Sequence, residues 1–445
     1  MTKPTVILAT SNGVGMGHLA RASAIALALK EYADPIIVSM AGGIAEIPDY
    51  MGIRCEYIPG RDRGWMPREK WDQYLRDRLL ALVDETGAKV MSFDGVVPYP
   101  GVIAAKFSHP KLALVWVRRG LWQKKPQRFV LGLQSKMMDY IVEPGDIARA
   151  YDFGPTASRK DATLTSPVSL YKEENALSRE EARKVLGLDL DRPAVLVQLG
   201  TGDSDVNEKL TAALSGLIGW KDLQVILTKH PVDKDGKSLA PEGLDIRVVR
   251  HFPLARVLHA FDAGVSATGY NGVHENLPAC LPTVFVSNIR GTDDQEARAQ
   301  WSHDMGFALR ANQADLADIT ATVRKLQDPA TRERLSRKCA ELPEPVHALR
   351  PEHQQWLDPR DDRVAGQRHH SPEFRYHDAA AAHRPGHRLG QRQRLRPVGL
   401  GVDAGRREGH PRGAGDGGRH PQRELELVGS LQHPVRWVQA ERPRA

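Results

Sequence analysis

Short runs rich in β-branched residues alternate with amphipathic helical stretches along most of the chain. The first run is TVILAT, the helical stretch after it starts at GHLARA, and the second run is PIIVSM. A second series of the same kind begins at AVLVQLG. This alternation favours parallel sheets built from βαβ units, and 445 residues are enough for two of them. We therefore expect an α/β protein with two doubly wound domains, at residues 1–165 and 166–345.

The last hundred residues, 346–445, differ from the rest in composition. They contain no Lys, Ile, Met, Asn, Thr or Cys, although they hold 10 of the 17 histidines. Five of the missing types have codons that begin with A, so the pattern follows codon position. Our leading hypothesis is a GC-rich gene read out of frame from near Val346, and the alternative is a true disordered arm that binds anionic surfaces. Both predict an irregular tail.

The distribution of charge bears on the class of partner. The formal net charge is +7, but most of the excess lies after residue 345 and the residues before it are nearly neutral. A basic surface of the kind that neutralises nucleic-acid phosphates is therefore not spread over the fold. We expect no nucleic-acid partner.

Localisation is inferred from the apolar pattern and the cysteines. The chain has no run of about 18 apolar residues, and its start, MTKPT, lacks a secretory signal. The three cysteines are far apart in sequence, which indicates neither a disulfide framework nor a CxxC metal site. We expect a cytoplasmic protein, with peripheral contact to the inner face of the membrane as a variant of this prediction.

Two stretches combine basic residues with tryptophan. They are PGRDRGWMPREKWDQYLRDR and WVRRGLWQKKPQR. Such stretches line an anionic or lipid-linked acceptor site or contact a membrane surface, or else they are solvated helix faces with buried tryptophans. The sequence leaves these alternatives open.

The turn SNGVGMGH opens the first predicted helix. Its exposed amides and the helix dipole suit an anion. Its glycines do not follow GxGxxG, and Met40 ends the second predicted strand where an acidic ribose ligand would be expected, which disfavours NAD. His18 lies in the first helical turn, where the dipole disfavours protonation, and a neutral imidazole can act as a general base. The alternative is that His18 only caps the helix or bonds locally.

A second glycine turn, ATGYNGVHE, is followed by the triplet in TDDQEARA. Backbone amides of Gly269, Tyr270 and Asn271 can cradle a pyrophosphate. Glu275 can accept hydrogen bonds from two ribose hydroxyls, and Asp294 with Gln295 can bind sugar hydroxyls. The alternative is that Glu275 and Asp294 are solvated helix residues.

These motifs resemble those of the GT-B glycosyltransferases, in particular the MurG family (glycosyltransferase family 28). The resemblance covers residues 4–342 and rests on GVGMGHLARA, LGTGD, TDDQEARA and, above all, FDAGVSATGYNGVHENLPACLPTVFVSN. It implies two Rossmann-like domains that face a central cleft, the first for the acceptor and the second for the nucleotide-sugar donor. It also implies inversion at the anomeric carbon without a metal or a cofactor. The plant and antibiotic-tailoring UDP-glycosyltransferases carry a phosphate-binding histidine where this chain has Ala267, which favours the first family.

The resemblance also implies roles for particular residues. On the donor side, Glu275 would bind ribose, Gly269 to Asn271 the diphosphate, and Asp294 with Gln295 the sugar. Phe252 would lie beside the base, with Gly200 and Thr201 in the turn after AVLVQ. His18 would face the acceptor hydroxyl. Asp94 would orient His18 or bind the acceptor, or only cap the segment after it. The remaining acceptor-side candidates are Gly15, Gly17 and Arg21.

We therefore predict a glycosyltransferase that moves a sugar from a UDP-sugar to the hydroxyl of a lipid-linked or small-molecule acceptor. Two alternatives stay open. GMGHLAR also fits the GxGHxxR turn of nucleotide-sugar hydrolases, and a non-catalytic nucleotide-sugar-binding protein would carry the same donor motifs.

Overall fold

The computed structural model describes residues 3–11, 16–41, 51–61, 66–123, 128–200, 204–229, 236, 238–289 and 292–342. The side chains of residues 128–130 and 204 are outside this description. The tail predicted to be irregular, 346–445, lies outside the described residues, as do Gly15 and Thr201.

The first half of the described chain forms a seven-stranded sheet in the order β3-β2-β1-β4-β5-β6-β7, with every neighbouring pair parallel. Its strands are β1 (Thr5–Thr10), β2 (Asp34–Ser39), β3 (Arg54–Tyr57), β4 (Val90–Asp94), β5 (Ala113–Val117), β6 (Tyr140–Pro144) and β7 (Thr163–Thr165). The strand order reverses direction between β1 and β4, as in a doubly wound sheet.

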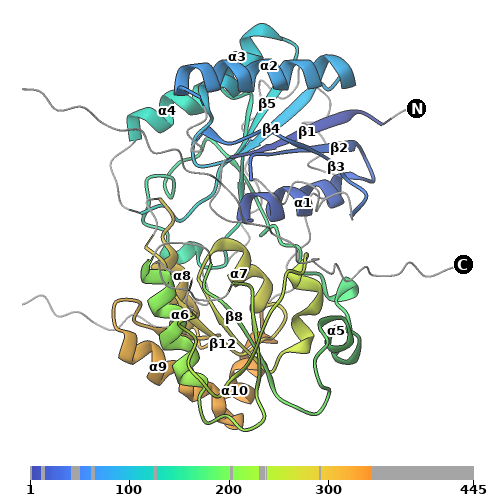
Figure 1. The fold of residues 1–445 in the computed structure, drawn as a ribbon. Coiled ribbons are helices and arrows are strands. Elements are labelled where there is room, and N and C mark those ends of the chain that lie inside the picture. The colour runs from blue at the N-terminus through green and yellow to red at the C-terminus, as the bar shows by residue number, and fades with distance from the viewer. Residues whose placement is uncertain are drawn as a thin grey trace, which may run out of the picture. The chain divides into compact units, whose positions relative to one another are not determined.

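Helices cover both faces of this sheet. They are α1 (Gly17–Leu29), α2 (Arg68–Thr86), α3 (Pro100–Ser108) and α4 (Arg128–Lys136), with a short 3-10 helix, η3 (Arg149–Tyr151). Helix α1 lies on one face, and α2 and α3 lie on the other (Figure 1). Gly87 ends α2 in the left-handed region, at φ 64°, which glycine adopts without strain.

The second half forms a six-stranded parallel sheet in the order β10-β9-β8-β11-β12-β13. Its strands are β8 (Ala194–Gln198), β9 (Gln224–Leu227), β10 (Asp245–Val248), β11 (Ala263–Ser266), β12 (Thr283–Val286) and β13 (Leu309–Ala311). Here the order reverses between β8 and β11. The fold prediction of two doubly wound parallel sheets is confirmed.

The second sheet is also covered on both faces. Its α-helices are α5 (Arg179–Leu186), α6 (Ser204–Leu217), α7 (Tyr270–Asn276), α8 (Gln295–Asp304), α9 (Leu316–Arg324) and α10 (Pro329–Cys339). Three 3-10 helices complete it: η4 (Glu173–Asn175), η5 (Leu254–Ala260) and η6 (Lys325–Gln327). Helix α5 begins with a capping box in which Ser178 and Glu181 bond each other's backbone amides, a common signal for a helix start.

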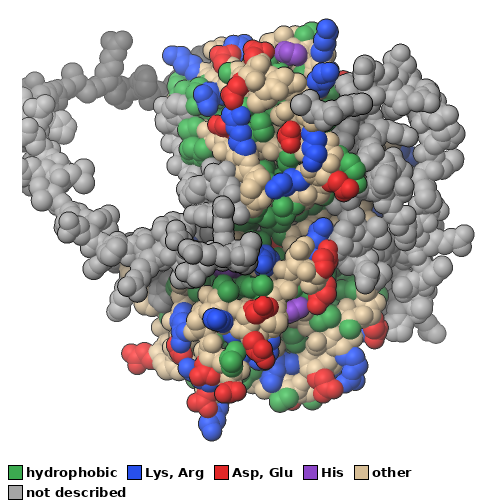
Figure 2. Space-filling view, turned by 90° about the vertical axis from the view of Figure 1, so that its right-hand side faces the viewer, with side chains coloured by type: hydrophobic (Ala, Val, Ile, Leu, Met, Phe, Trp, Pro, Cys, Tyr) green, Lys and Arg blue, Asp and Glu red, His purple; other side chains and the backbone are tan. Residues whose placement is uncertain are grey.

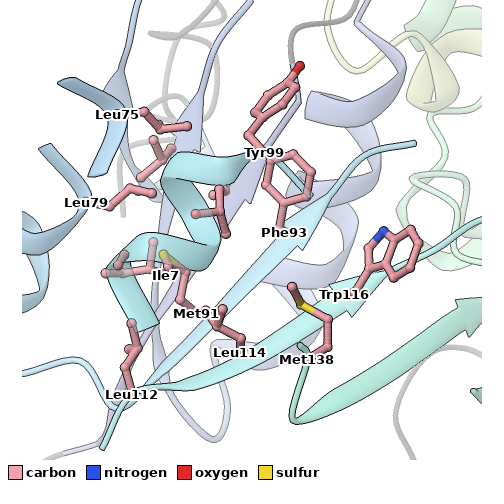
Figure 3. Packing of buried hydrophobic residues seen from close by; sticks show 14 of the residues in the cluster. Ile7, Leu75, Leu79, Met91, Phe93, Tyr99, Leu112, Leu114, Trp116 and Met138 are labelled. Atoms are coloured by element: carbon pink, nitrogen blue, oxygen red, sulfur yellow. The ribbon is translucent and has the colours of Figure 1, made fainter. Parts of the chain in front are cut away.

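Strand β1 shows why these strands read as continuous apolar runs. Val6 and Leu8 belong to the core under α1, whereas Ile7 and Ala9 belong to the core under α2 and α3. Both faces of a strand are therefore buried, as expected for a parallel sheet. Figure 3 shows the core under α2 and α3, which includes Leu75 and Leu79 of α2, Ile7 of β1 and Phe93 of β4.

Several elements differ from the sequence prediction. The sequence predicts YIVEP as the last strand of the first half, but Thr163–Thr165 adds β7 beside it. The segment LARVLHAF, for which the sequence predicted no type of element, contains the 3-10 helix η5. The pattern also gave no indication of α4, β13, α9 or α10. The domain boundaries at 165 and 345 stay predictions.

Lys and Arg are interspersed with Asp and Glu on the face seen in Figure 2. Within the part of the chain that the structure describes, no helix is long and apolar enough to span a membrane.

Candidate functional site

The site is built first from the ends of β1 and β4, where the order of the first sheet reverses. The Ser11 amide, just past β1, donates to the Asp94 carbonyl at the end of β4, at 2.7 Å. Helix α1 begins six residues after Ser11, at Gly17. In doubly wound sheets the crevice at this reversal is where ligands bind.

His18 and Asp94 form a hydrogen-bonded pair at this point. His18 Nδ1 lies 2.8 Å from Asp94 Oδ1, with the His18 side chain 17% exposed and that of Asp94 3% exposed. Burial alone would raise the pKa of Asp94, but Arg21 and His18 outweigh burial and hold this pKa well below its usual range. An ionised Asp94 only accepts hydrogen bonds, so Nδ1 carries a proton, and in the neutral form of the ring Nε2 is the nitrogen with the free lone pair. The pair therefore has the form of a histidine base oriented by a carboxylate.

Arg21 lies on the next turn of α1 and also binds Asp94. Its Nε donates to Asp94 Oδ2 at 2.7 Å and its Nη2 to Oδ1 at 2.5 Å. Arg21 is buried. Arg21 was expected on the acceptor side, and in the structure it fixes the carboxylate that orients His18.

The second part of the site follows β11, where the order of the second sheet reverses. Gly269 is the N-cap of α7, and Tyr270 and Asn271 are its first residues. Asn271 Nδ2 donates to the Gly17 carbonyl at 3.0 Å. This bond joins the start of α7 to the start of α1.

Glu275, one turn into α7, is partly buried. Burial raises the pKa of its carboxyl to about 8. Among the described residues, no side chain or backbone amide binds this carboxyl group. A carboxyl group that lacks protein donors is suited to accept hydrogen bonds from a ligand's hydroxyls, and such bonds would favour its ionised form.

Asp294 and Gln295 bond within the protein. Asp294 caps α8 by accepting from the Ala297 amide at 3.0 Å. Gln295 is buried, and its Oε1 accepts from the Asn288 amide at 3.0 Å while its Nε2 donates to Asp293 Oδ2 at 3.4 Å. A sugar could bind these two side chains only in addition to their internal hydrogen bonds or by replacing them. Their predicted contacts with a sugar therefore stay predictions.

The other predicted donor residues lie on separate loops. Phe252 is partly exposed and packs against the core that includes η5. Gly200 follows β8 with φ 86°, a left-handed conformation that favours glycine. The predicted contacts of Phe252 with the nucleotide base and of Gly200 with the donor stay predictions.

A buried network of charged side chains lies next to the start of α7, and the sequence analysis did not predict it. Arg298 of α8 donates from Nε to Asp146 Oδ2 at 2.7 Å and from Nη1 to Asp293 Oδ1 at 2.8 Å. Its Nη1 also donates to the Thr268 carbonyl at 3.2 Å, immediately before the glycine turn. Arg298 is four residues after Asp294 in TDDQEARA, and this helical spacing was the available signal. Nothing in the sequence indicated Asp146, 152 residues away.

His274 connects α7 to the segment after β6. Its Nδ1 donates to the Tyr270 carbonyl at 2.6 Å, and its Nε2 accepts from the Ile147 amide at 3.1 Å. Burial lowers the pKa of His274, which agrees with a neutral ring used as donor and acceptor. The loop before α8 is also hydrogen-bonded to the first half of the chain, because the Asp294 amide donates to the Leu121 carbonyl at 2.9 Å.

The tryptophans of the two basic stretches belong to the interior where they are described. Trp71 and Trp116 are 0% exposed and Trp122 is 3% exposed. These three tryptophans are therefore core residues and do not line a surface site. For them, the structure favours the alternative of solvated helix faces with buried tryptophans. No group of three or more His, Cys, Asp or Glu side chains in the described ranges could hold a metal ion, and metal independence stays a prediction.

Comparison with solved structures identifies the fold class of this chain. No family model matches the chain. Two solved structures have a similar fold. One is the glycosyltransferase of kitacinnamycin, with TM-score 0.51 and 15% identity over 77% of this chain and 95% of that one. The other is described as a UDP-N-acetylglucosamine 2-epimerase from Listeria monocytogenes, with TM-score 0.52 and 11% identity over 76% of this chain and 91% of that one. With its two doubly wound sheets, the chain has the GT-B fold.

Sequence similarity to curated proteins indicates which family within this fold class the chain resembles. The chain is similar to the UDP-N-acetylglucosamine--N-acetylmuramyl-(pentapeptide) pyrophosphoryl-undecaprenol N-acetylglucosamine transferases of Nocardioides sp. and Rhodococcus jostii. The Nocardioides protein is 30% identical over 167 residues, 36% of this chain and 45% of that relative. The Rhodococcus jostii protein is 25% identical over 365 residues, 76% of this chain and 92% of that relative. The chain thus resembles the MurG family of GT-B proteins.

Proposed function

We propose that this protein is a glycosyltransferase that transfers a sugar from a UDP-sugar to an acceptor hydroxyl with inversion. The observation that carries the proposal is the bond between His18 and Asp94 beside the α7 glycine turn. A buried, ionised Asp94 gives His18 the tautomer that a general base needs. The curated relatives are named for transfer from UDP-N-acetylglucosamine, which makes this the first donor to test.

The proposed reaction is a single displacement. The acceptor oxygen attacks the anomeric carbon, and its proton passes to His18 Nε2. The bond from that carbon to the β-phosphate oxygen breaks on the opposite face, and the nucleoside diphosphate leaves. Backbone amides at Gly269, Tyr270 and Asn271 are the proposed donors to the departing diphosphate. Attack on one face and departure from the other inverts the anomeric carbon.

Glu275 is the proposed ribose ligand. Two ribose hydroxyls would supply the hydrogen-bond donors that its carboxyl group lacks within the described protein. Because these donors favour the ionised form, UDP binding should lower the pKa of Glu275 from about 8.

For the acceptor, we propose a lipid-linked molecule. The relatives are named for a pyrophosphoryl-undecaprenol acceptor. A groove of about 500 Å³ is lined by Val97, which follows Asp94 by three residues in the sequence, by Ile103 of α3 and by the exposed Phe107. Arg61 and Arg68 also line this groove and suit an anionic group next to the apolar one. We propose that such an acceptor brings the protein to the membrane surface.

The test is to compare wild type with His18→Ala for donor binding and for turnover. Calorimetry with UDP should give similar Kd values, since His18 is on the acceptor side of the proposed site. Product formation should fall at least a hundredfold in the variant. Equal turnover of the two proteins would contradict the assignment of the base.

The same assay separates the alternatives. Release of free sugar at the full rate without any acceptor would indicate a hydrolase. Saturable UDP-sugar binding without turnover, under every acceptor tried, would indicate a binding protein.

A further inference from the structure

Asp94 is held on both of its carboxylate oxygens. Oδ1 accepts from His18 Nδ1 and from Arg21 Nη2, and Oδ2 accepts from Arg21 Nε. Rotation of this carboxylate would therefore break bonds to Arg21 before it could release His18. The orientation of the His18 ring depends on where Arg21 is held.

Arg21 is in turn packed against an aromatic ring from the second half of the chain. Its guanidinium carbon lies 5.0 Å from the centroid of the Tyr270 ring, within the range of a cation–π interaction. Arg21 is 4% exposed and Tyr270 is 6% exposed, so water screens this attraction little.

The Tyr270 ring itself is fixed at its far end. Its hydroxyl donates to the Gly145 carbonyl at 2.8 Å and accepts from the Val168 amide at 2.9 Å. Arg298 also approaches the ring, at 5.9 Å from its centroid, and is bound to Asp146 and Asp293. The ring therefore gives Arg21 a rigid surface to pack on.

We propose that Tyr270 is a positioning residue for the base: its ring holds Arg21, Arg21 holds Asp94, and Asp94 holds His18 with Nε2 toward the acceptor. This inference rests on the proposed function of His18. It assigns to the Tyr270 side chain a role separate from that of its backbone amide, which is the proposed contact to the diphosphate. The ring carries this role, and the hydroxyl only anchors the ring.

The distinction can be tested in the full chain with Tyr270→Leu and Tyr270→Phe. Loss of the ring in Tyr270→Leu should lower kcat at least tenfold while the KM for UDP-N-acetylglucosamine changes less than threefold. Tyr270→Phe keeps the ring and should keep kcat within threefold of wild type, although its Tm should fall. Tyr171→Leu is the matched control, because Tyr171 is a buried tyrosine whose hydroxyl bonds to Glu173 and His259 and not to Gly145 or Val168. It should lower Tm and leave kcat unchanged.

A spectroscopic measurement supports the kinetic one. In ¹⁵N NMR spectra, His18 should show a protonated Nδ1 and an unprotonated Nε2 in wild type and in Tyr270→Phe, and a mixture of tautomers in Tyr270→Leu. If Tyr270→Leu does not fold, Tyr270→Met takes its place, since methionine fills part of the same space but has no aromatic ring to hold Arg21. It should show the same loss of kcat and the same mixture of tautomers.

The outcomes separate this inference from the function on which it rests. If His18→Ala keeps its turnover, the proposed base is wrong. If His18→Ala is inactive but folded Tyr270→Leu has wild-type kcat, only the positioning role is wrong. A Tyr270→Phe variant as slow as Tyr270→Leu would also overturn it, because the hydroxyl would then be the essential group.

Discussion

Glu275→Gln should make the folded protein more stable at alkaline pH while it weakens donor binding. In the folded chain the pKa of the Glu275 carboxyl is raised by burial from 4.5 to about 8. Between these values the unfolded chain has released the proton that the folded chain still holds. The free energy of unfolding therefore falls as pH rises through this window, and this contribution is absent when residue 275 is glutamine.

The size of the effect follows from the shift. One proton held only by the folded state corresponds to about 1.4 kcal/mol for each pH unit inside the window. Between pH 6 and pH 8 the wild type would lose at most about 2 kcal/mol through this group, since its titration is half complete at about pH 8. Because Glu275 is partly exposed and water stabilises part of its charge, we expect about 1 kcal/mol.

The assay is urea unfolding of wild type, Glu275→Gln and Glu208→Gln at pH 6 and pH 8. Glu208 is an exposed glutamate on α6 and serves as the matched control. The stability of Glu275→Gln relative to wild type should rise by about 1 kcal/mol from pH 6 to pH 8, whereas that of Glu208→Gln should stay constant. Calorimetry with UDP should show at least tenfold weaker binding to Glu275→Gln. A constant stability difference together with unchanged UDP affinity would refute the reasoning.

Three further substitutions test separate parts of the structure. Asp94→Asn removes the charge that sets the His18 tautomer and should lower kcat about a hundredfold or more, measured as UDP release at saturating donor. Ser178→Ala breaks the capping box of α5 and should cost about 1 kcal/mol in chemical denaturation with kcat unaltered. Gly101→Ala would place a methyl group against the Asp72 carbonyl of α2 and should destabilise the fold by about 1–3 kcal/mol, seen as a lower Tm; an unchanged Tm would contradict the close packing of α2 and α3.

The sequence predicted an element correctly where the pattern of apolar residues matches the burial of those residues in the fold. Strand β1 is buried on both faces, so TVILAT is apolar throughout and marks a parallel strand. Strand β7 could not be found in this way. Thr163–Thr165 is exposed to partly exposed and pairs with β6 at the edge of the sheet, so no apolar run marks it.

Prediction of the site was limited by the distance between interacting residues along the chain. His18 and Asp94 could be paired because His18 follows β1 and Asp94 ends the neighbouring strand β4, and the carboxyl ends of parallel strands meet at one edge of the sheet. The bonds from Arg298 to Asp146 and from Tyr270 to Gly145 join residues more than 120 positions apart, and no periodic pattern predicts such contacts. Gln295 is predicted to bind a sugar, and in the structure its side-chain oxygen accepts from the Asn288 amide. The motif TDDQ does not distinguish a ligand contact from an internal hydrogen bond, so the sugar contact stays a prediction.

The central claim is that His18 transfers the acceptor's proton during sugar transfer. Its most direct test is mass spectrometry of the products formed by wild type and His18→Ala from UDP-N-acetylglucosamine and a polyprenyl-pyrophosphate-linked acceptor, at equal occupancy by the donor. We expect an acceptor heavier by one N-acetylhexosamine with wild type, and at least a hundredfold less of it with His18→Ala. Equal amounts of this product from both proteins would exclude His18 as the base.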